Sequence, residues 1–439
     1  MSPPRRSRRL PTACVVGSGA REHALALALA RSADVVATPG NPGIAGISPE
    51  GHSLSSVDVP PEEIDADLFV IGPEAPLVEG LADRLRSRGG VVFGPGADGA
   101  RIEGSKRFMK ELCSAAGVET ATWGSFDEPA GAVDFLRSLP GPYVVKADGL
   151  AAGKGVLVTS DLAEAEADAA SKLSGAAFGD AGRRVVIEEG ICGPELSLFC
   201  VCDGRRAVPL PPARDYKRVG TGDAGPNTGG MGALCPVPGV GEDLVSDILE
   251  RIVLRTLFEL GRRGVEYRGL LYAGLMLTDS GPKLIEFNAR FGDPETEVVL
   301  PLLGGDLYEL LSAAALGDLG GLESVGDFDA AVTGAAVCVV AASPGYPAAP
   351  VTGSPISGVE QAGSVEGVRV LHAGTRRNEA GALVTAGGRV LCVSGAASGL
   401  PAARSAAYAA IGRISFEGMQ FRSDIAAAQA PAHTAELHR

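Results

Sequence analysis

The chain is poor in the residues that build several common kinds of site. Its 439 residues include only five histidines, eight cysteines and one tryptophan. The closest cysteines, Cys200 and Cys202, lie two positions apart, and no histidines have a metal-ligand spacing, so we expect no zinc site. No apolar run approaches the roughly 18 residues of a membrane-spanning helix. We therefore expect reduced cysteines, a cytoplasmic location and no membrane partner.

A surplus of positive charge is also missing. The 39 lysines and arginines stand against 53 aspartates and glutamates, which gives a net charge of −14. Without a broad basic surface the chain is not expected to bind nucleic acid, although local cations and backbone N–H groups can still bind a small anion. Arg5, Arg6, Arg8 and Arg9 precede no apolar segment, so we expect a disordered arm there and no secretory signal. An upstream start codon and a transit peptide are the alternatives.

The chain has ample core-forming residues, and its length is typical of about three domains. Hydrophobic residues make up 45%, and the 61 glycines cluster in motifs. In the first part, apolar strands alternate with helices, which predicts an α/β domain over 1–104 with an open parallel sheet and helices on both faces. The expected strands are 13–16, 35–37, 68–71 and 91–93, and the expected helices are 22–31 and 78–87.

The rest of the chain is expected to form two further domains. A helix over 106–116, with Ser105 as its N-cap, opens a central domain at 105–330. Short glycine-separated strands predict a small α+β lid at about 121–193, and a long amphipathic helix is expected at 242–261. Strand-like sequence followed by a helix predicts a small α+β C-terminal domain at 331–439. The expected strands of the lid are 143–146, 155–158 and 185–188, and the last helix is expected at 402–414.

The segment 284–295 is the most informative one. In a regular strand Glu286, Asn288 and Arg290 share one face, with Leu284 beside them, and offer hard oxygen ligands for Mg²⁺ and a guanidinium for an anion. The opposite face would then pack in the core. That face comprises Ile285, Phe287 and Ala289. The alternative interpretation is a polar, solvated strand face.

A glycine-rich turn follows the strand that ends near Lys146. Its glycines let N–H groups approach phosphate oxygens, and Lys146 and Lys154 add positive charge. It differs from a Walker A loop, because Gly155 stands where Ser or Thr is required. An ordinary β-hairpin turn is the alternative.

Two later segments are candidates for the nucleotide and for an anionic substrate. The strand end at 186–191, with Glu195 soon after, can hold an adenine edge with backbone groups and leave a carboxylate for ribose, although surface acids are the simpler alternative. The segment 215–233 is a glycine-rich loop that contains Lys217, Arg218, Asn227 and Thr228. Long loops inside compact domains are usually functional or disordered, so an anion site is favoured over an ordinary surface loop.

The turn Gly17-Ser18-Gly19 is a weak dinucleotide signal. Glu22 stands where the fingerprint has its third glycine, and the second strand is not followed by an acidic residue. A helix N-terminus still attracts anions. We therefore expect a phosphate cradle for a substrate and not for NAD.

These motifs in this order resemble the phosphoribosylamine–glycine ligases, a family of the ATP-grasp superfamily. The resemblance spans about residues 14–425. It rests on GSGAREHA at 17–24, GPEAPL at 72–77, EGSK at 103–106, the loop 146–155, KRVG at 217–220, GPNTGGMGA at 225–233, IEFNARFGDPE at 285–295, HAGT at 372–375 and GGRVL at 387–391. A different ATP-grasp ligase and a non-catalytic nucleotide-binding regulator are the rival interpretations. Loop 225–233 argues against the first, and the presence of Glu286, Asn288 and Lys146 against the second.

The resemblance implies an ATP-dependent ligase of purine biosynthesis that joins glycine to 5-phosphoribosylamine through a glycyl phosphate, with ATP and Mg²⁺ or Mn²⁺ as cofactors. It implies Glu286 and Asn288 as metal ligands, and we expect a monomer with small-molecule partners only. The implied catalytic residues are Arg290, Lys146 and Asp215. The implied ATP-binding residues are Lys106, Lys146, Gly149, Gly153, Lys154, Gly155, Glu188, Glu189, Ile191 and Glu195. The implied substrate-binding residues are Gly17, Ser18, Gly19, Arg21, Glu22, Glu74, Lys217, Arg218, Asn227 and Thr228.

Overall fold

The computed structural model of the chain describes residues 10–150, 155–175, 183–321 and 334–427. The arm expected at the N-terminus therefore lies outside the described residues. So do Gly153 and Lys154 of the glycine-rich loop.

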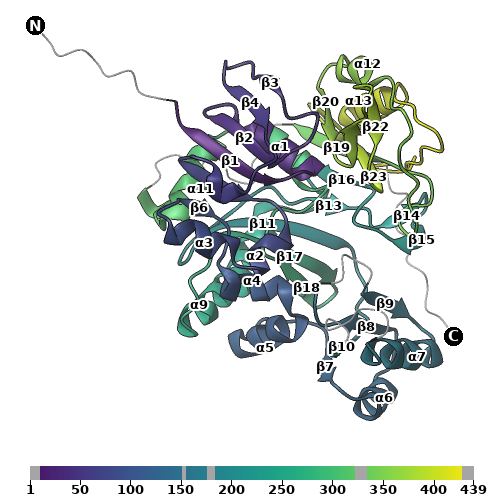
Figure 1. Cartoon of the computed structure of the whole chain (residues 1–439). Coiled ribbons are helices and arrows are strands. Elements are labelled where there is room, and N and C mark those ends of the chain that lie inside the picture. Colours follow the sequence, from purple (N-terminus) through teal and green to yellow (C-terminus); the bar gives the residue numbers. More distant parts are fainter. Residues whose placement is uncertain (1–9, 151–154, 176–182, 322–333, 428–439) are drawn as a thin grey trace, which may run out of the picture.

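The N-terminal part contains a six-stranded sheet in the order β3-β4-β2-β1-β5-β6, in which only β3 runs antiparallel to its neighbour. The apolar strands lie between helices, as Figure 1 shows, which confirms the expected open parallel sheet. The strands are β1 (Thr12–Gly17), β2 (Asp34–Pro39), β3 (Gly46–Ile47), β4 (Ser53–Ser56), β5 (Leu68–Ile71) and β6 (Val92–Phe93). The helices are α1 (Ala20–Leu29), the 3-10 turn η1 (Pro61–Glu63), α2 (Glu74–Val78), α3 (Leu81–Ser87) and α4 (Ala97–Gly104).

One expected helix is divided in two. The sequence predicts a single helix over 78–87, but α2 ends at Val78 and α3 begins at Leu81. Gly80 lies between them with φ of 78°, a left-handed conformation that interrupts a helix. As a result Glu74 stands in the first turn of its own short helix.

The lid is a separate four-stranded antiparallel sheet in the order β7-β10-β8-β9, with two helices that contact it. Its small core centres on Val145 and Ile187 and is distinct from the two larger cores of the molecule. The expected α+β lid is confirmed, although the sequence did not identify its helices. The elements are β7 (Trp123–Phe126), α6 (Pro129–Ser138), β8 (Tyr143–Ala147), β9 (Val156–Thr159), α7 (Leu162–Leu173) and β10 (Val185–Glu189).

A second four-stranded sheet, β12-β11-β17-β18, lies at the centre of the molecule. The helix expected at 106–116 is present as α5, and Ser105 caps it by accepting a hydrogen bond from Phe108 N at 3.1 Å. The expected long helix is also present, with a π-helical turn in its middle. The elements are α5 (Lys106–Ala116), β11 (Glu195–Asp203), β12 (Ala207–Pro209), α8 (Glu242–Ile248), η3 (Leu249–Leu254), α9 (Arg255–Arg262), β17 (Arg268–Thr278), β18 (Gly281–Asn288), α10 (Thr296–Val299), η4 (Leu300–Leu302), α11 (Leu307–Leu316) and η5 (Leu319–Gly321).

The alternation expected along β18 is broken at Ile285. Gly274 of β17 pairs with Glu286, but the next residue, Leu275, pairs with Leu284, so Ile285 is an extra residue in a β-bulge. The bulge turns Leu284 into the core with Phe287 and Ala289, whereas Ile285 is only half-buried. The prediction for Leu284 and Ile285 was therefore wrong.

The C-terminal sheet, β13-β16-β19-β23-β20, takes two strands from the middle of the chain. β13 and β16 flank the loop at 215–233, and β16 pairs with β19, more than 100 residues later. The loop itself contains the two-stranded hairpin β14–β15. The elements are β13 (Arg214–Asp215), β14 (Arg218–Gly220), β15 (Ala224–Asn227), β16 (Gly232–Cys235), β19 (Ala335–Ala342), α12 (Val359–Gly363), β20 (Val368–His372), β21 (Thr375–Arg377), β22 (Leu383–Thr385), β23 (Arg389–Ala397) and α13 (Leu400–Ile411).

Among the described residues, no single helix has the length and apolar character needed to cross a bilayer. The residues Thr296–Leu302 and Leu307–Leu316 meet the length and composition test only as a pair, and they are bent by 108°.

Candidate active site between the lid and the central sheet

Three buried side chains form a cluster where the lid meets α5. Lys146 on β8 lies with its Nζ 2.6 Å from Glu188 Oε1 on β10. Lys110 on α5 donates from Nζ to the other oxygen, Oε2, at 2.8 Å. We call Lys110, Lys146 and Glu188 the lysine cluster. Lys110 was not identified from the sequence, although it lies four residues after Lys106 and thus on the same helix face.

The lysine cluster has one more cation than anion. Burial raises the pKa of Glu188, but the ammonium groups of Lys146 and Lys110 outweigh it and hold that pKa below its usual value. Burial lowers the pKa of Lys110, and the Glu188 carboxylate opposes that shift. Two buried ammonium groups therefore share one carboxylate, which leaves a local demand for a further anion.

The N-terminus of α5 is bound to the start of the glycine-rich loop. Asp148 Oδ1 accepts hydrogen bonds from Arg107 N at 2.8 Å and from Ser105 Oγ at 3.1 Å. Lys106 Nζ donates to Gly149 O at 3.2 Å. An acidic side chain at a helix N-terminus is electrostatically favourable, so Asp148 fixes the loop against the helix that presents Lys106.

The residues expected near adenosine have specific partners here. The oxygens of Glu188 pair with lysines rather than being left for ribose, Glu189 Oε1 accepts from Thr122 N at 2.9 Å, and Glu195 Oε2 lies 2.7 Å from Lys217 Nζ. Ile191 is half-buried just after β10. Gly155 O accepts a hydrogen bond from Ala147 N at 2.9 Å, which closes the glycine-rich loop across β8 and β9. The strand ends where the sequence predicted, while its role in binding adenosine stays a prediction. The ion pairs that occupy its carboxylates were not predicted.

Glu286 and Asn288 share one face of β18. Between them the pairing with β17 is regular, since Gly274, Ala273 and Tyr272 oppose Glu286, Phe287 and Asn288 in turn. Both side chains are half-buried, and the charge of Glu286 acts on Lys106 and on Glu103. A carboxylate and an amide oxygen side by side, close to a second carboxylate, fit a hard divalent cation.

Arg290 lies beyond the strand and is held by two carboxylates. Its Nη2 is 3.1 Å from Glu103 Oε1, its Nε is 3.3 Å from Glu74 Oε2, and its Nη1 donates to Phe291 O at 3.1 Å. We call Glu74, Glu103 and Arg290 the glutamate cluster. Burial lowers the pKa of Arg290, but Glu103 and Glu74 raise it more, so the guanidinium stays charged.

The two carboxylates of this cluster differ. Burial raises the pKa of Glu74, yet Arg290 and other favourable contacts outweigh it and hold the pKa below its usual value. Burial raises the pKa of Glu103 more than Arg290 lowers it. Glu103 Oε2 also accepts from Ala289 N at 2.8 Å, which connects α4 to the residue that follows β18. The motif Glu103–Lys106 was identified from the sequence, but the contact of Glu103 with Arg290 was not.

The turn after β1 binds a side chain of its own helix. Glu22 is buried, and its Oε2 accepts from Gly19 N at 2.6 Å while Oε1 lies 2.5 Å from Arg21 Nε. A side chain at Gly17 or Gly72 would collide with Glu22. Arg21 also donates to Phe291 O at 3.1 Å, and only Ser18 is exposed in the turn. The turn was expected to bind a phosphate, but its Gly19 N–H donates to Glu22. The same carboxylate holds Arg21 in position.

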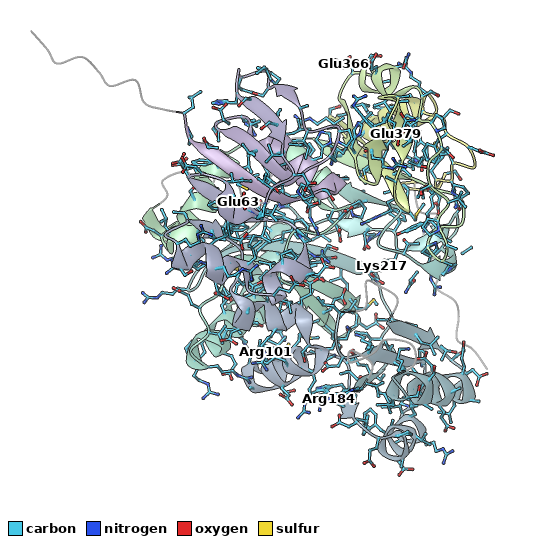
Figure 2. The ribbon with its side chains drawn as sticks, in the orientation of Figure 1. Glu63, Arg101, Arg184, Lys217, Glu366 and Glu379 are labelled. Carbon is cyan, nitrogen blue, oxygen red and sulfur yellow. The ribbon has the colours of Figure 1, made fainter. Side chains whose placement is uncertain are left out.

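Lys217 joins the loop 215–233 to the central sheet. Its Nζ lies 2.8 Å from Asp215 Oδ1 and 2.7 Å from Glu195 Oε2. Burial lowers the pKa of Lys217, but the carboxylates of Asp215 and Glu195 outweigh this effect and hold the pKa well above its usual value. Figure 2 labels Lys217 between the C-terminal part of the chain, above it in this view, and the lid, below it. Of the other residues expected here, Thr228 donates to Lys217 O at 2.8 Å, Arg218 donates to Gly225 O at 2.7 Å, and Asn227 is exposed.

Two further networks next to the site were missed by sequence reasoning. Arg389 contacts Asp293 Oδ2 at 3.1 Å and donates to Gly229 O at 2.6 Å, which connects the segment 284–295 with the loop 215–233. Tyr272 donates to Glu295 Oε1 at 2.5 Å. Asp293, Glu295 and Arg389 lie within motifs that the sequence did single out, but their partners are distant along the chain.

Three family models together match most of the chain. The model described as phosphoribosylglycinamide synthetase, N domain, matches residues 12–103, its ATP-grasp (A) domain matches 104–296, and its C domain matches 336–428.

Named proteins are similar over nearly the same span. A phosphoribosylamine–glycine ligase of Streptomyces coelicolor is 48% identical over 428 residues, which are 95% of this chain and 99% of that protein. One from Mycobacterium tuberculosis H37Rv is 48% identical over 424 residues, 94% of this chain and 96% of that protein.

Solved structures agree on the fold. A phosphoribosylamine–glycine ligase of Thermotoga maritima superposes with a TM-score of 0.82 at 35% identity and covers 94% of this chain and 100% of that one. The biotin carboxylase domain of a Hydrogenobacter thermophilus 2-oxoglutarate carboxylase, solved with MgADP, has a TM-score of 0.67 at 17% identity and covers 94% of this chain and 92% of that one. The second likeness concerns the fold alone.

Proposed function

Because the chain belongs to the phosphoribosylglycinamide synthetase family, and is thus a ligase with an ATP-grasp domain, we propose that it joins glycine to 5-phosphoribosylamine in purine biosynthesis. The products are glycinamide ribonucleotide, ADP and phosphate. The observation that supports this proposal best is the contrast between the lysine cluster, which has excess positive charge, and the glutamate cluster, in which two carboxylates share one guanidinium. A site with both can hold a nucleotide polyphosphate beside a cation.

The chemistry requires activation of a carboxylate. An amine does not displace an oxygen from a carboxylate, whereas it does displace phosphate from an acyl phosphate. We propose that a glycine carboxylate oxygen attacks the γ-phosphorus of ATP, which breaks the bond to the bridging oxygen and releases ADP. The amine of phosphoribosylamine then attacks the glycyl carbonyl carbon, loses a proton, and expels inorganic phosphate that keeps the former glycine oxygen. Positioning and electrostatics supply the rate, so no nucleophilic side chain is needed.

On the nucleotide side, Lys106 and Lys146 would bind phosphate oxygens of ATP. Lys146 is suited to this because Glu188 fixes its ammonium group at 2.6 Å while Lys110 supplies the other charge that Glu188 needs. The described glycines Gly149 and Gly155, with Gly153 and Lys154, would cover the phosphates. Glu189, Ile191 and Glu195 would hold the adenosine. Glu188 would contribute indirectly, by positioning the ammonium groups of Lys110 and Lys146.

On the acceptor side, Glu286 and Asn288 would hold Mg²⁺ or Mn²⁺, which when bound neutralises phosphate charge. Arg290 would neutralise the charge that develops on the transferred phosphoryl group, and its two carboxylates fix its orientation. Asp215 and Lys217 would bind the amine substrate. The turn at Gly17–Gly19, with Arg21 and Glu74, would face the same substrate from the N-terminal domain. Arg218, Asn227 and Thr228 would complete this side.

Other proposals concern the whole chain. Domain boundaries near 104 and 330, a monomer and a cytoplasmic location remain predictions. The described cysteines are all free thiols, and seven of the eight are buried, which is compatible with a reducing compartment.

Isotope transfer tests the reaction directly. With glycine labelled with ¹⁸O in its carboxylate, one label should pass into inorganic phosphate for each turnover, and ADP release should require both glycine and phosphoribosylamine. Release of unlabelled phosphate would exclude the glycyl phosphate. ADP release that continues at the full rate without phosphoribosylamine would exclude it as the acceptor.

A further inference from the structure

The hairpin β14–β15 has little support from its own sheet. It is only two strands, with one residue pair at Arg218 and Asn227 and another at Gly220 and Ala224. The residues from Thr221 to Asn227 are exposed. A two-stranded hairpin of this size is marginal in water, so it needs contacts from elsewhere to hold one position.

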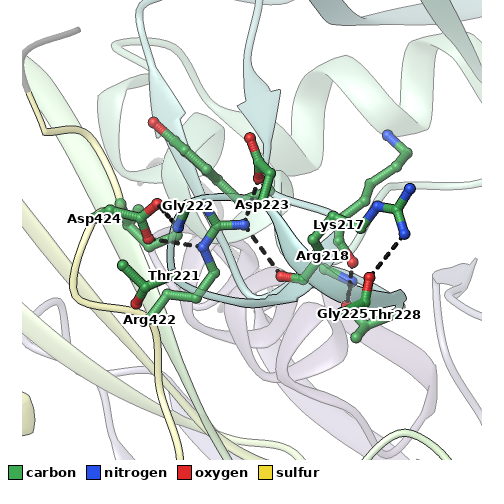
Figure 3. Close-up of polar contacts among 12 residues, drawn as sticks. Lys217, Arg218, Thr221, Gly222, Asp223, Gly225, Thr228, Arg422 and Asp424 are labelled. Atoms are coloured by element: carbon green, nitrogen blue, oxygen red, sulfur yellow. Dashed lines mark hydrogen bonds and ion pairs between the residues drawn. The ribbon is translucent and has the colours of Figure 1, made fainter.

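Arg422, near the C-terminal end of the described chain, supplies such contacts. Its side chain is 1% exposed. Nη1 donates to Arg218 O in the first strand of the hairpin at 3.1 Å and to Asp223 Oδ1 in its turn at 2.6 Å. Nε and Nη2 donate to the two oxygens of Asp424 at 2.8 and 2.6 Å. Figure 3 shows the guanidinium between Asp424 and the hairpin.

Neighbouring residues of the same C-terminal segment bind the hairpin too. Asp424 Oδ2 accepts from Gly222 N at 2.9 Å, and Ser423 N donates to Thr221 Oγ1 at 3.2 Å. The Arg422 guanidinium also lies over the Tyr216 ring, 5.0 Å from its centroid. Arg422 is therefore in contact with both the hairpin tip and the residue that precedes Lys217.

The hydrogen bond from Arg422 to Arg218 O lies one residue along the chain from Lys217. At the base of the hairpin, Thr228 N and Oγ1 both donate to Lys217 O, at 2.7 and 2.8 Å. From this backbone position the Lys217 ammonium contacts Asp215 and Glu195. The hydrogen bond from Arg422 to Arg218 O therefore links the C-terminal segment to the backbone next to Lys217.

We propose that Arg422 is a positioning residue for the ligase reaction: it holds the hairpin 218–227 so that Lys217 and Arg218 can bind the phosphorylated amine substrate. This inference rests on the proposed function of the loop 215–233. Arg422 itself touches no substrate. Its role is to bind the backbone and the turn of the hairpin with a planar fork of donors, which a lysine cannot reproduce.

The test compares Arg422→Met, Arg422→Lys and Asp424→Asn with the wild-type chain. A small displacement of a binding group can cost on the order of 100-fold in rate, so Arg422→Met should raise the KM for phosphoribosylamine about 10- to 100-fold and leave the KM for ATP within about twofold. Arg422→Lys should recover only part of the loss. Arg413→Met is the matched control, because Arg413 is an exposed arginine of the same domain that donates to Gln361 O at 2.8 Å and does not touch the hairpin.

A second measurement follows the hairpin without turnover. Trypsin cleaves after lysine and arginine, so cleavage after Lys217 or Arg218, located by mass spectrometry, should be faster in Arg422→Met and Asp424→Asn than in the wild type or the control. Unchanged cleavage at these bonds, or equal rises in KM for ATP and for phosphoribosylamine, would overturn the inference. If the wild-type chain does not consume phosphoribosylamine, the proposed function is wrong. The cleavage rates still test whether Arg422 holds the hairpin 218–227 in place. If Arg422→Met does not fold, Asp424→Asn gives the same comparison.

Discussion

The lysine cluster and the glutamate cluster have opposite surplus charges: two cations share one carboxylate in the first, and two carboxylates share one cation in the second. In the first, Lys110 and Lys146 share Glu188 at 2.8 and 2.6 Å; in the second, Glu103 and Glu74 share Arg290 at 3.1 and 3.3 Å. Burying a charged group costs desolvation free energy, which only the attraction of opposite charges can offset. The surplus charge of each cluster is therefore unfavourable until a ligand of opposite charge binds.

The difference indicates which ligand each region awaits. The lysine cluster lies where the lid meets α5, and one more anion would compensate its surplus charge. The glutamate cluster lies beside Glu286, and one more cation would compensate its surplus. Glu286 lies near both clusters: its charge acts on Glu103 of the glutamate cluster and on Lys106, whose pKa is also affected by Lys146 of the lysine cluster. A bound ATP with its divalent cation would compensate the surplus charge of both clusters together.

The largest effect is expected on β18. Glu286→Ala or Asn288→Ala should lower kcat by about 100- to 1,000-fold, because each removes a proposed ligand of the divalent cation. The fold should persist, since both side chains are half-buried and outside the core. Steady-state turnover and circular dichroism test this. Asp279→Ala, an exposed carboxylate just before β18, is the control and should be neutral. Unfolding of both variants at ordinary temperature would show a structural role instead.

Removing one lysine should equalise the charge of the lysine cluster. In Lys110→Met, Glu188 keeps Lys146 alone, so the surplus positive charge disappears and the Kd for ATP should rise about tenfold while the KM for glycine stays constant. The magnitude corresponds to about 1.4 kcal/mol, typical of one charge-assisted hydrogen bond. Titration calorimetry with ATP measures it. Arg137→Met, which breaks an exposed ion pair of the lid with Glu166, should leave the affinity unchanged. An unaltered Kd in Lys110→Met would mean that the surplus charge has no part in ATP binding.

The glutamate cluster can be neutralised in the same way. Glu103→Gln keeps the size of the side chain and removes one of the two carboxylates around Arg290. Groups behind a metal ligand typically affect metal affinity by about 10- to 100-fold, and we expect a loss near the lower limit. The activity should be recovered at higher Mg²⁺ concentration, with the Kd for ATP measured without metal unchanged. If added Mg²⁺ does not restore activity, Glu103 acts on Arg290 and not on the cation.

A buried contact between two neutral histidines can be compared with the two charged clusters. His23 and His372 meet where α1 and β20 are packed, with His372 N donating to His23 Nδ1 at 2.9 Å. Burial, then the neighbouring positive charges, lowers the pKa of His23 to about 3, and burial lowers that of His372 to about 4.

Because both pKa values lie below the ordinary value of about 6.5, the unfolded chain binds more protons than the folded one at mildly acidic pH. The stability that these histidines contribute is fully present above about pH 6.5 and falls as the pH drops toward 4. Chemical unfolding at a series of pH values should show a smaller pH dependence in His372→Gln than in the wild type, with no change in the KM for ATP at pH 7.5. An identical pH dependence would exclude this contact as its source.

Much of the fold follows from local sequence patterns. Ser105 was identified as a helix cap, and β5 occupies the predicted 68–71, because capping and alternation depend on neighbouring residues only. The face shared by Glu286 and Asn288 was predictable for the same reason. The break at Gly80 was not, since glycine is compatible with either one helix or two.

What the tertiary structure alone decided is the partner of each charge. The sequence by itself determined the family motifs and the three-part architecture, and it predicted groups that could bind phosphate and metal. It could not determine that Lys110 would meet Glu188, 78 residues away, or that Arg422 would meet Asp223, 199 residues away. The pairing of β16 with β19 and the bulge that turns Leu284 inward are of the same kind. Such contacts depend on how sheets pack and on which buried charges must be compensated, and these are properties of the folded chain rather than of any one segment.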